Sequence, residues 1–251
     1  MSDIVLILAH ATDSGAAAVA AALRGWATSG LASGLASGSA SVAVWEVRPE
    51  SLTLAHWSHG IDEHGQASTH IALPERPALA SAQIRAVLNR VQYLPVAQFL
   101  QAQTKDRDYA QAEFQALIVS WLGACGDRVI HSLHIDPALP QQLSFLRWCT
   151  AAVQCGLPLA RAIQSPALVW DTTILVAGSR TSSSTGHLAA RFAQACVATA
   201  HLLGFALLEF CFNCQDGEFT LVAVNLHPLL RTASDIHATT HLIAEVAGLG
   251  K

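Results

Sequence analysis

Apolar runs alternate with amphipathic segments along the N-terminal part of the chain. A continuous apolar run at residues 4–9 predicts a strand that is buried on both faces, as the strands of a parallel sheet are, and further strands are expected at residues 42–47 and 129–133. A weaker strand is expected at residues 91–96, where a proline would confine it to an edge or a strand end. Together these runs indicate one parallel sheet.

Helices are expected between these strands. Residues 15–27 form an alanine-rich helix, and Thr12 or Asp13 can cap it by accepting backbone N–H groups at its start. The clearest amphipathic pattern covers residues 106–122, and a further helix is expected at residues 139–154. Strands that alternate with helices are typical of a Rossmann-like, doubly wound sheet.

The pattern changes after residue 160. The order becomes strand, helix, hairpin and helix, which is typical of an α+β fold. The predicted strands are residues 168–177, 205–213 and 219–225, and the predicted helices are residues 185–203 and 235–247. We therefore expect an α/β protein with two domains, a parallel-sheet domain at residues 1–160 and an α+β domain at residues 161–251.

The amino-acid composition and the net charge exclude some classes of binding partner. The chain is 52% apolar and 13% charged, with a net charge of −4, which argues against nucleic acid because clustered Lys and Arg are needed to neutralise phosphates. We expect a cytoplasmic protein that does not enter a membrane, because no apolar stretch has the length of a span and no positive segment precedes the first apolar run. The large apolar fraction also predicts a homo-oligomer, since a compact core of this size hides less apolar side chain.

Two groups of histidines are weak candidates for a metal site. The first group is spaced His-x2-His-x4-His-x5-His without a cysteine and matches no closed zinc module, so a solvated hairpin or polar excursion is the simpler interpretation. The second lacks the glutamate that a zinc protease uses as its base. We predict no metal site, although a metal-binding protein built on histidines stays open as an alternative. The groups are His56, His59, His64 and His70, and His227, His237 and His241.

Two other motifs leave functional interpretations open. Cys211 and Cys214 have the spacing of a redox pair or half a zinc knuckle, but strand alternation puts them on opposite faces. The six cysteines as a set predict reduced thiols rather than a disulfide framework. The Ser/Thr run at residues 180–185 either caps the following helix or binds an anion at the start of that helix.

The C-terminal third carries a more specific pattern. It contains Leu207-Leu208-Glu209-Phe210, then Asp216-Gly217-Glu218, then the apolar run from Leu221 to Pro228. This pattern resembles the closing hairpin of ATP-grasp carboxylate–amine ligases, in particular the RimK-like and microviridin-ligase-like group. The first strand with its alanine-rich helix, and the later motif Cys155-Gly156-Leu157-Pro158, are similar to the Rossmann-like pre-ATP-grasp domain of the same family.

The resemblance implies where a nucleotide site would lie. By position, Glu209 matches the first magnesium-binding carboxylate and Asn225 matches the amide ligand, whereas Ala223 stands where the family has a second glutamate. The alternative interpretation of Glu209 is a strand residue that faces solvent or pairs with Arg180 or Arg191.

Departures from the family pattern are as informative as the match. The family grips ATP phosphates with lysines, but this chain has only Lys105 and Lys251. In the family a lid subdomain follows the Gly-Leu-Pro motif, whereas here only residues 162–171 separate this motif from the run Thr173 to Gly178, which resembles the family strand that follows the lid. So short a segment cannot build a lid, since extended chain covers only about 3.3–3.6 Å per residue. We therefore expect a reduced ATP-grasp-like second domain that lacks the lid.

Three hypotheses follow. The first is a catalytically degenerate ATP-grasp-like protein without a cofactor, which serves as an accessory, scaffold or ligand-binding subunit in a peptide-modification or cofactor-biosynthesis pathway. Its partner would be a second copy or a pathway enzyme such as an active ATP-grasp ligase. The alternative is an active ATP-dependent ligase in which Glu209 and Asn225 hold magnesium, and arginines such as Arg180, Arg191 or Arg231 bind the phosphates of ATP. The third is the histidine-based metal-binding protein.

Overall fold

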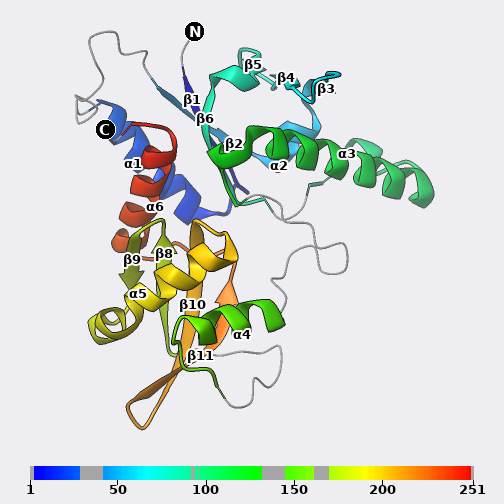
Figure 1. Cartoon of the computed structure of the whole chain (residues 1–251). Coiled ribbons are helices and arrows are strands. Elements are labelled where there is room, and N and C mark those ends of the chain that lie inside the picture. Colours follow the sequence, from blue (N-terminus) through cyan, green and yellow to red (C-terminus); the bar gives the residue numbers. More distant parts are fainter. Residues whose placement is uncertain are drawn as a thin grey trace. The chain divides into compact units, whose positions relative to one another are not determined.

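The computed structural model describes residues 3–28, 42–91, 94–95, 97–131, 145–160 and 170–249 (Figure 1). The chain divides into two compact units, one of Met1–Leu133 with Ile243–Lys251 and the other of His134–Leu242. Helix α4 (Phe145–Gln154) buries Trp148 and Ala152 in the core of the second unit. The division therefore falls before α4, whereas the sequence placed it between residues 160 and 161.

A parallel sheet organises the first unit, as the sequence predicted. Its strand order is β2-β1-β6-β7, and all three neighbouring pairs are parallel. The strands are β1 (Ile4–Leu8), β2 (Ala43–Val47), β6 (Ile84–Asn89) and β7 (Val129–Ile130). Because β2 lies on one side of β1 and β6 on the other, the winding of the chain reverses at β1.

One strand of this sheet lies elsewhere than predicted. The strand next to β1 is Ile84–Asn89, and the described residues of 91–96 are not in a strand. Val87 and Leu88 have no exposed surface, and they pair with the fully buried β1. The polar residues Arg85 and Asn89 interrupt the apolar pattern, so this segment does not stand out as a buried strand in the sequence.

Helices and a hairpin complete the first unit. The alanine-rich helix is α1 (Ser14–Thr28), and the predicted cap is confirmed because the N–H of Ala16 donates to Asp13 Oδ1 over 2.9 Å. Helix α3 covers the segment predicted to be amphipathic, but its buried residues begin only at Ile118. It ends at Gly126 with φ 56°, a conformation that suits glycine. The remaining elements are α2 (Pro49–Thr53), α3 (Thr104–Cys125), β5 (Leu79–Ala80) and the 3₁₀ turns Ser81–Gln83, Ala97–Phe99 and Gly126–Arg128.

The histidine-rich segment forms the predicted hairpin. Strands β3 (His56–Ile61) and β4 (Ala67–Ala72) pair antiparallel. His59 has a structural role, since its two ring nitrogens lie 2.8 Å from Thr69 Oγ1 and 2.8 Å from Ser120 Oγ of α3. This contact joins the hairpin to α3, which runs beside it in Figure 1.

The second unit contains a four-stranded antiparallel sheet of order β11-β10-β8-β9. The predicted hairpin is confirmed as β10 (Leu207–Gln215) and β11 (Glu218–Asn225), and β8 (Thr172–Ala177) lies beside β10. The Ser/Thr run contributes β9 (Arg180–Ser183) instead of a loop, because its backbone pairs with β8. Thr185, at the helix start, makes no side-chain capping bond.

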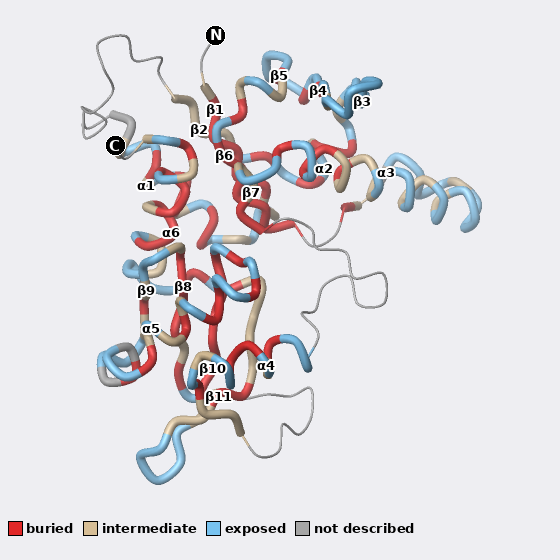
Figure 2. The backbone as a smooth tube through the Cα atoms, viewed as in Figure 1, coloured by how far each residue is buried: buried red, intermediate tan, exposed pale blue. Residues whose placement is uncertain are grey.

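Helices cover the core of this sheet. Helix α5 (Gly186–Leu203) packs Phe192 against Phe212 with ring centroids 5.6 Å apart, and it ends at Gly204 with φ 80°. The last helix is α6 (Ala233–Val246). Figure 2 shows the buried residues gathered along β8 and β10, with exposed residues at the tip of the β10–β11 hairpin. Within the described residues, no helix has both the length and the apolar character of a membrane span.

Candidate functional site

The paired strands β10 and β11 bring Glu209 and Asn225 together. The two residues are opposite each other in the strand register, and Asn225 Nδ2 donates a 2.9 Å hydrogen bond to Glu209 Oε2. Ala223 lies two residues before Asn225 on the same strand, so its Cβ points to the same face. The structure therefore brings together residues 209, 223 and 225, which the sequence resemblance selected, and the side chain at residue 223 is a methyl group.

Glu209 is buried rather than solvent-facing, with only 3% of its surface exposed. Loss of solvent raises the pKa of its carboxyl above the ordinary value. Hydrogen bonds from Asn225 and Thr173 and the charge of Arg231 act in the opposite direction, while the charge of Asp235 adds to the increase in pKa. Burial dominates, so this carboxyl holds a proton more readily than an exposed glutamate does.

Arg231 and Asp235, whose charges act on Glu209, belong to the start of α6. Thr232 and Asp235 form a reciprocal capping box: Asp235 N–H donates to Thr232 Oγ1 over 3.1 Å, and Thr232 N–H donates to Asp235 Oδ2 over 2.9 Å. The N–H of Arg231 also donates to Asp235 Oδ2, over 3.1 Å. The Asp235 carboxylate is thus committed to the helix start, which fixes its position relative to Glu209.

The donor set at Glu209 does not fit the magnesium ion that the ATP-grasp resemblance implies. Magnesium prefers octahedral oxygen ligation with one or two carboxylates. Here the amide nitrogen of Asn225 faces Glu209, and its oxygen accepts the N–H of His227 over 2.9 Å. Ala223 supplies no oxygen from its side chain. The carboxylate of Glu209 is already hydrogen-bonded, and the nearby carboxylate of Asp235 accepts backbone N–H groups at the start of α6.

Of the three arginines expected near the phosphates, Arg231 acts on Glu209 through its charge, whereas Arg180 and Arg191 lie elsewhere in the second unit. Arg191 Nη2 is 3.2 Å from Glu218 Oε2, and both side chains are more than half exposed. The interpretation that Arg191 pairs with Glu209 is therefore wrong, because the charge of Arg191 is matched at the hairpin tip. Arg180 is an exposed residue of β9, opposite Ala177 of β8.

The C-terminal histidines meet only as a pair. The rings of His237 and His241, one helical turn apart on α6, are edge to face with centroids 4.3 Å apart. Across the residues that the structure describes, no three His, Cys, Asp or Glu side chains converge as metal ligands. The cysteines are free thiols in the described structure, with Cys211 buried and Cys214 exposed.

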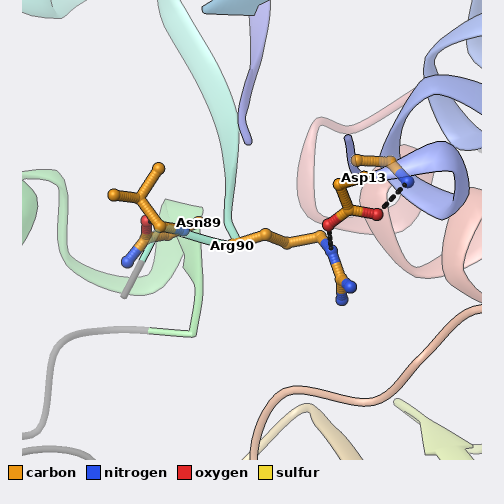
Figure 3. Close-up of polar contacts among 5 residues, drawn as sticks. Asp13, Asn89 and Arg90 are labelled. Carbon is orange, nitrogen blue, oxygen red and sulfur yellow. Dashed lines mark hydrogen bonds and ion pairs between the residues drawn. The ribbon is translucent and has the colours of Figure 1, made fainter. Parts of the chain in front are cut away.

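A second polar arrangement lies in the first unit, at the carboxyl end of its sheet. Arg90 follows β6 directly, and its side chain reaches Asp13 at the start of α1, as Figure 3 shows. Arg90 Nε lies 2.6 Å from Asp13 Oδ2, with 6% and 19% of the two side chains exposed. Beside it, Asn89 Nδ2 donates to the carbonyl of His131, and Asn89 Oδ1 accepts the N–H of Val91. The C-terminal end of β6 is therefore bonded to the start of α1 through Arg90 and to the residue after β7 through Asn89.

A cavity of about 630 Å³ adjoins this ion pair. It lies where β1 and β2 end, and the turn after β4 closes one of its sides. Ligands of open α/β sheets bind beyond the carboxyl ends of the strands. The charged and hydroxyl side chains of the lining are His10, Asp13, Glu46, Arg48, Ser51, Glu75 and Arg76.

This cavity was not predicted from the sequence, although the sequence contains a signal for it. Polar residues follow two predicted parallel strands directly, with His10 to Asp13 after the first and Arg48 after the second. The carboxyl ends of parallel strands lie at the same edge of a sheet, so these residues are expected to lie close together. Arg90 could not be placed in the same way because its strand was not recognised.

Comparison with solved structures identifies the fold. The macrocyclase MdnB from Microcystis aeruginosa MRC is 15% identical over 98% of this chain and 99% of its own, with a TM-score of 0.64. A Chryseobacterium gregarium RiPP-associated ATP-grasp ligase, in complex with ADP and a leader and core peptide, is 11% identical over 97% of each chain, with a TM-score of 0.71. The macrocyclase MdnC from Microcystis aeruginosa MRC, bound with precursor peptide MdnA, has a TM-score of 0.66 at 11% identity, covering 94% of this chain and 98% of its own.

Sequence comparison alone does not detect this relationship. No protein-family model matches the chain, and no curated protein matches it. The resemblance to ATP-grasp ligases is nevertheless confirmed at the level of the fold, because the similarity extends over nearly the whole length of each of these structures.

Proposed function

We propose that this chain uses its ATP-grasp fold for binding, as an accessory subunit of a peptide-modification pathway that does not turn over ATP. One observation carries the proposal: Glu209 is buried and hydrogen-bonded to Asn225, and Ala223 leaves the position beside them without a carboxylate. A site that must gather magnesium and phosphates needs oxygens that face a ligand.

Charge supports the same conclusion. ATP phosphates need several fixed cations. Arg231 is a cation whose charge acts on Glu209, but neither lysine of the chain, Lys105 or Lys251, belongs to the β10–β11 hairpin. The connection at residues 162–171 is too short for a lid over a nucleotide, although most of it lies outside the described residues. A reduced second domain without a lid is therefore part of the proposal.

The peptide side of the proposal rests on the structural neighbours. Two of the most similar structures are bound to leader, core or precursor peptides. A chain that keeps their fold but lacks their phosphate chemistry is suited to hold a peptide or to assist an active ligase. We also propose that it works as a homo-oligomer or beside such a ligase.

Calorimetry with magnesium and ATP tests the loss of nucleotide binding. We expect no saturable heat with the full chain at ATP concentrations up to the millimolar range, and no release of ADP. A matched pair of variants sharpens the experiment: Ala223→Glu adds the missing carboxylate, and Ala223→Gln adds the same volume without charge. Only Ala223→Glu is expected to gain weak magnesium binding. Micromolar ATP binding by the wild type that Glu209→Gln abolishes would instead favour the active ligase.

Panning of a displayed random-peptide library on the folded chain tests the binding role. Enriched peptides that bind the folded chain but not the heat-denatured chain are the expected result. Recovery of unrelated peptides at background frequency would contradict a peptide-binding role.

A further inference from the structure

The cavity of the first unit contains charges of both signs, and some of them are already matched. Arg90 Nε forms an ion pair with Asp13 Oδ2 over 2.6 Å, and Asp13 Oδ1 accepts a hydrogen bond from the N–H of Ala16 over 2.9 Å. Arg24 Nη2 forms an ion pair with Glu46 Oε1 over 2.6 Å. These two carboxylates therefore keep little capacity for a ligand, because each is neutralised by its arginine.

Three other charges of the lining are not matched in this way. In the described part of the chain, neither Arg48 nor Glu75 makes an ion pair, and both side chains are exposed. Arg76 makes no ion pair there either. Its Nη2 donates to the neutral backbone carbonyl of Glu46 over 3.3 Å. The cavity is thus left with two guanidinium groups and one carboxylate available to a ligand.

Arg76 is held in place although its charge is uncompensated. Its guanidinium carbon lies 5.1 Å from the ring centroid of Trp45, which is a cation–π contact. Its backbone N–H donates to the carbonyl of Leu73 across the turn that bears Glu75. A guanidinium that is fixed before binding loses less freedom when it meets a planar carboxylate.

From this arrangement we infer that the cavity binds a small zwitterion, a free amino acid or a short peptide with free ends. Its carboxylate pairs with Arg48 and Arg76, and its ammonium group pairs with Glu75. A phosphate dianion would meet the repulsion of Glu75, and a simple cation would meet two arginines. The volume of about 630 Å³ lies within the usual range for small-ligand sites, about 300–1,000 Å³.

This inference is independent of the proposed function. Every residue that carries it belongs to the first unit, whereas the proposed function rests on Glu209 and Asn225 of the second. The cavity can therefore bind its ligand whether or not the chain binds ATP, and either conclusion can fail alone.

Ligand chemistry provides the first test and needs no variant. Pools of the common amino acids and of dipeptides are screened against the full chain by saturation-transfer NMR, and the strongest ligand is measured by calorimetry. We expect at least one zwitterion to bind, and its N-acetylated and C-amidated forms each to bind at least tenfold more weakly. No binding at millimolar concentration, equal binding of both blocked forms, or tighter binding of inorganic phosphate would overturn the inference.

Variants provide the second test. Arg48→Gln and Arg76→Gln should each weaken the zwitterion at least tenfold, with less effect on its C-amidated form. Glu75→Gln should weaken the free amine form selectively. Arg107→Gln is the matched control, because this arginine of α3 belongs to the same unit but lies outside the cavity lining. Equal losses in Arg107→Gln, or none in the three cavity variants, would show that the lining does not recognise the ligand.

Discussion

Asn225 donates its side-chain amide to the carboxylate of Glu209 over 2.9 Å, across two paired strands. The same amide accepts the backbone N–H of His227 through its oxygen. The nitrogen and the oxygen of this side-chain amide therefore both form hydrogen bonds within the second unit. These hydrogen bonds are those of a buried structural contact.

Glu209 should make stability depend on pH with a defined sign. Burial raises its folded-state pKa above the ordinary 4.5, so its contribution to the unfolding free energy is full below the unfolded-state pKa and is lost as pH rises through the folded-state pKa. We expect the stability of wild type relative to Glu209→Gln to fall as pH rises above 4.5. Urea unfolding at a series of pH values measures it.

The control for this measurement is Glu218→Gln. Glu218 lies on the same hairpin, with 72% of its side chain exposed, so its removal should change the pH dependence less. An equal pH dependence in both variants would show that burial of Glu209 does not control its protonation.

The ion pair between Asp13 and Arg90 should be important for the stability of the first unit. Arg90→Met leaves the largely buried Asp13 carboxylate without its cation, and we expect a loss of about 3 kcal/mol of unfolding free energy. Arg85→Met is the control, because the pair of Arg85 with Asp3 is more exposed and should contribute less than about 1 kcal/mol. Chemical denaturation of both variants measures the difference, and similar losses would contradict this prediction.

Thiol reactivity should follow burial. Cys196 and Cys211 are fully buried, and burial raises the pKa of both thiols, which keeps them protonated and slow to react. Cys214 is exposed and should react first with iodoacetamide at pH 8. Mass spectrometry of timed samples gives the order. Early labelling of Cys211 would indicate that the β10–β11 hairpin opens readily.

Self-association should involve α4. This helix exposes Leu146 by 73% and Val153 by 61%, seven residues apart and hence on one face. We expect light scattering to give about twice the chain mass of 26.5 kDa, and Leu146→Glu to give the monomer. Leu54→Glu, at a similarly exposed leucine of the first unit, should leave the mass unchanged. A monomeric wild type at micromolar concentration would contradict the prediction.

Local pattern was sufficient for most elements. The buried run that became β1 is continuous in the sequence, and the hairpin of β10 and β11 is marked by its Gln-Asp-Gly turn. It was insufficient where polar residues occupy a strand. β6 includes Arg85, and β9 is a Ser/Thr segment that becomes a strand only because β8 offers an edge for pairing.

The sequence by itself determined the elements and the residues at positions 209, 223 and 225, because period and turn chemistry act over a few neighbouring residues. The tertiary structure alone decided that Glu209 is buried, since burial depends on what packs over a strand. It also decided that Asp13 meets Arg90, 77 residues later in the chain. Contacts of that kind follow from strand order, which local periodicity does not specify.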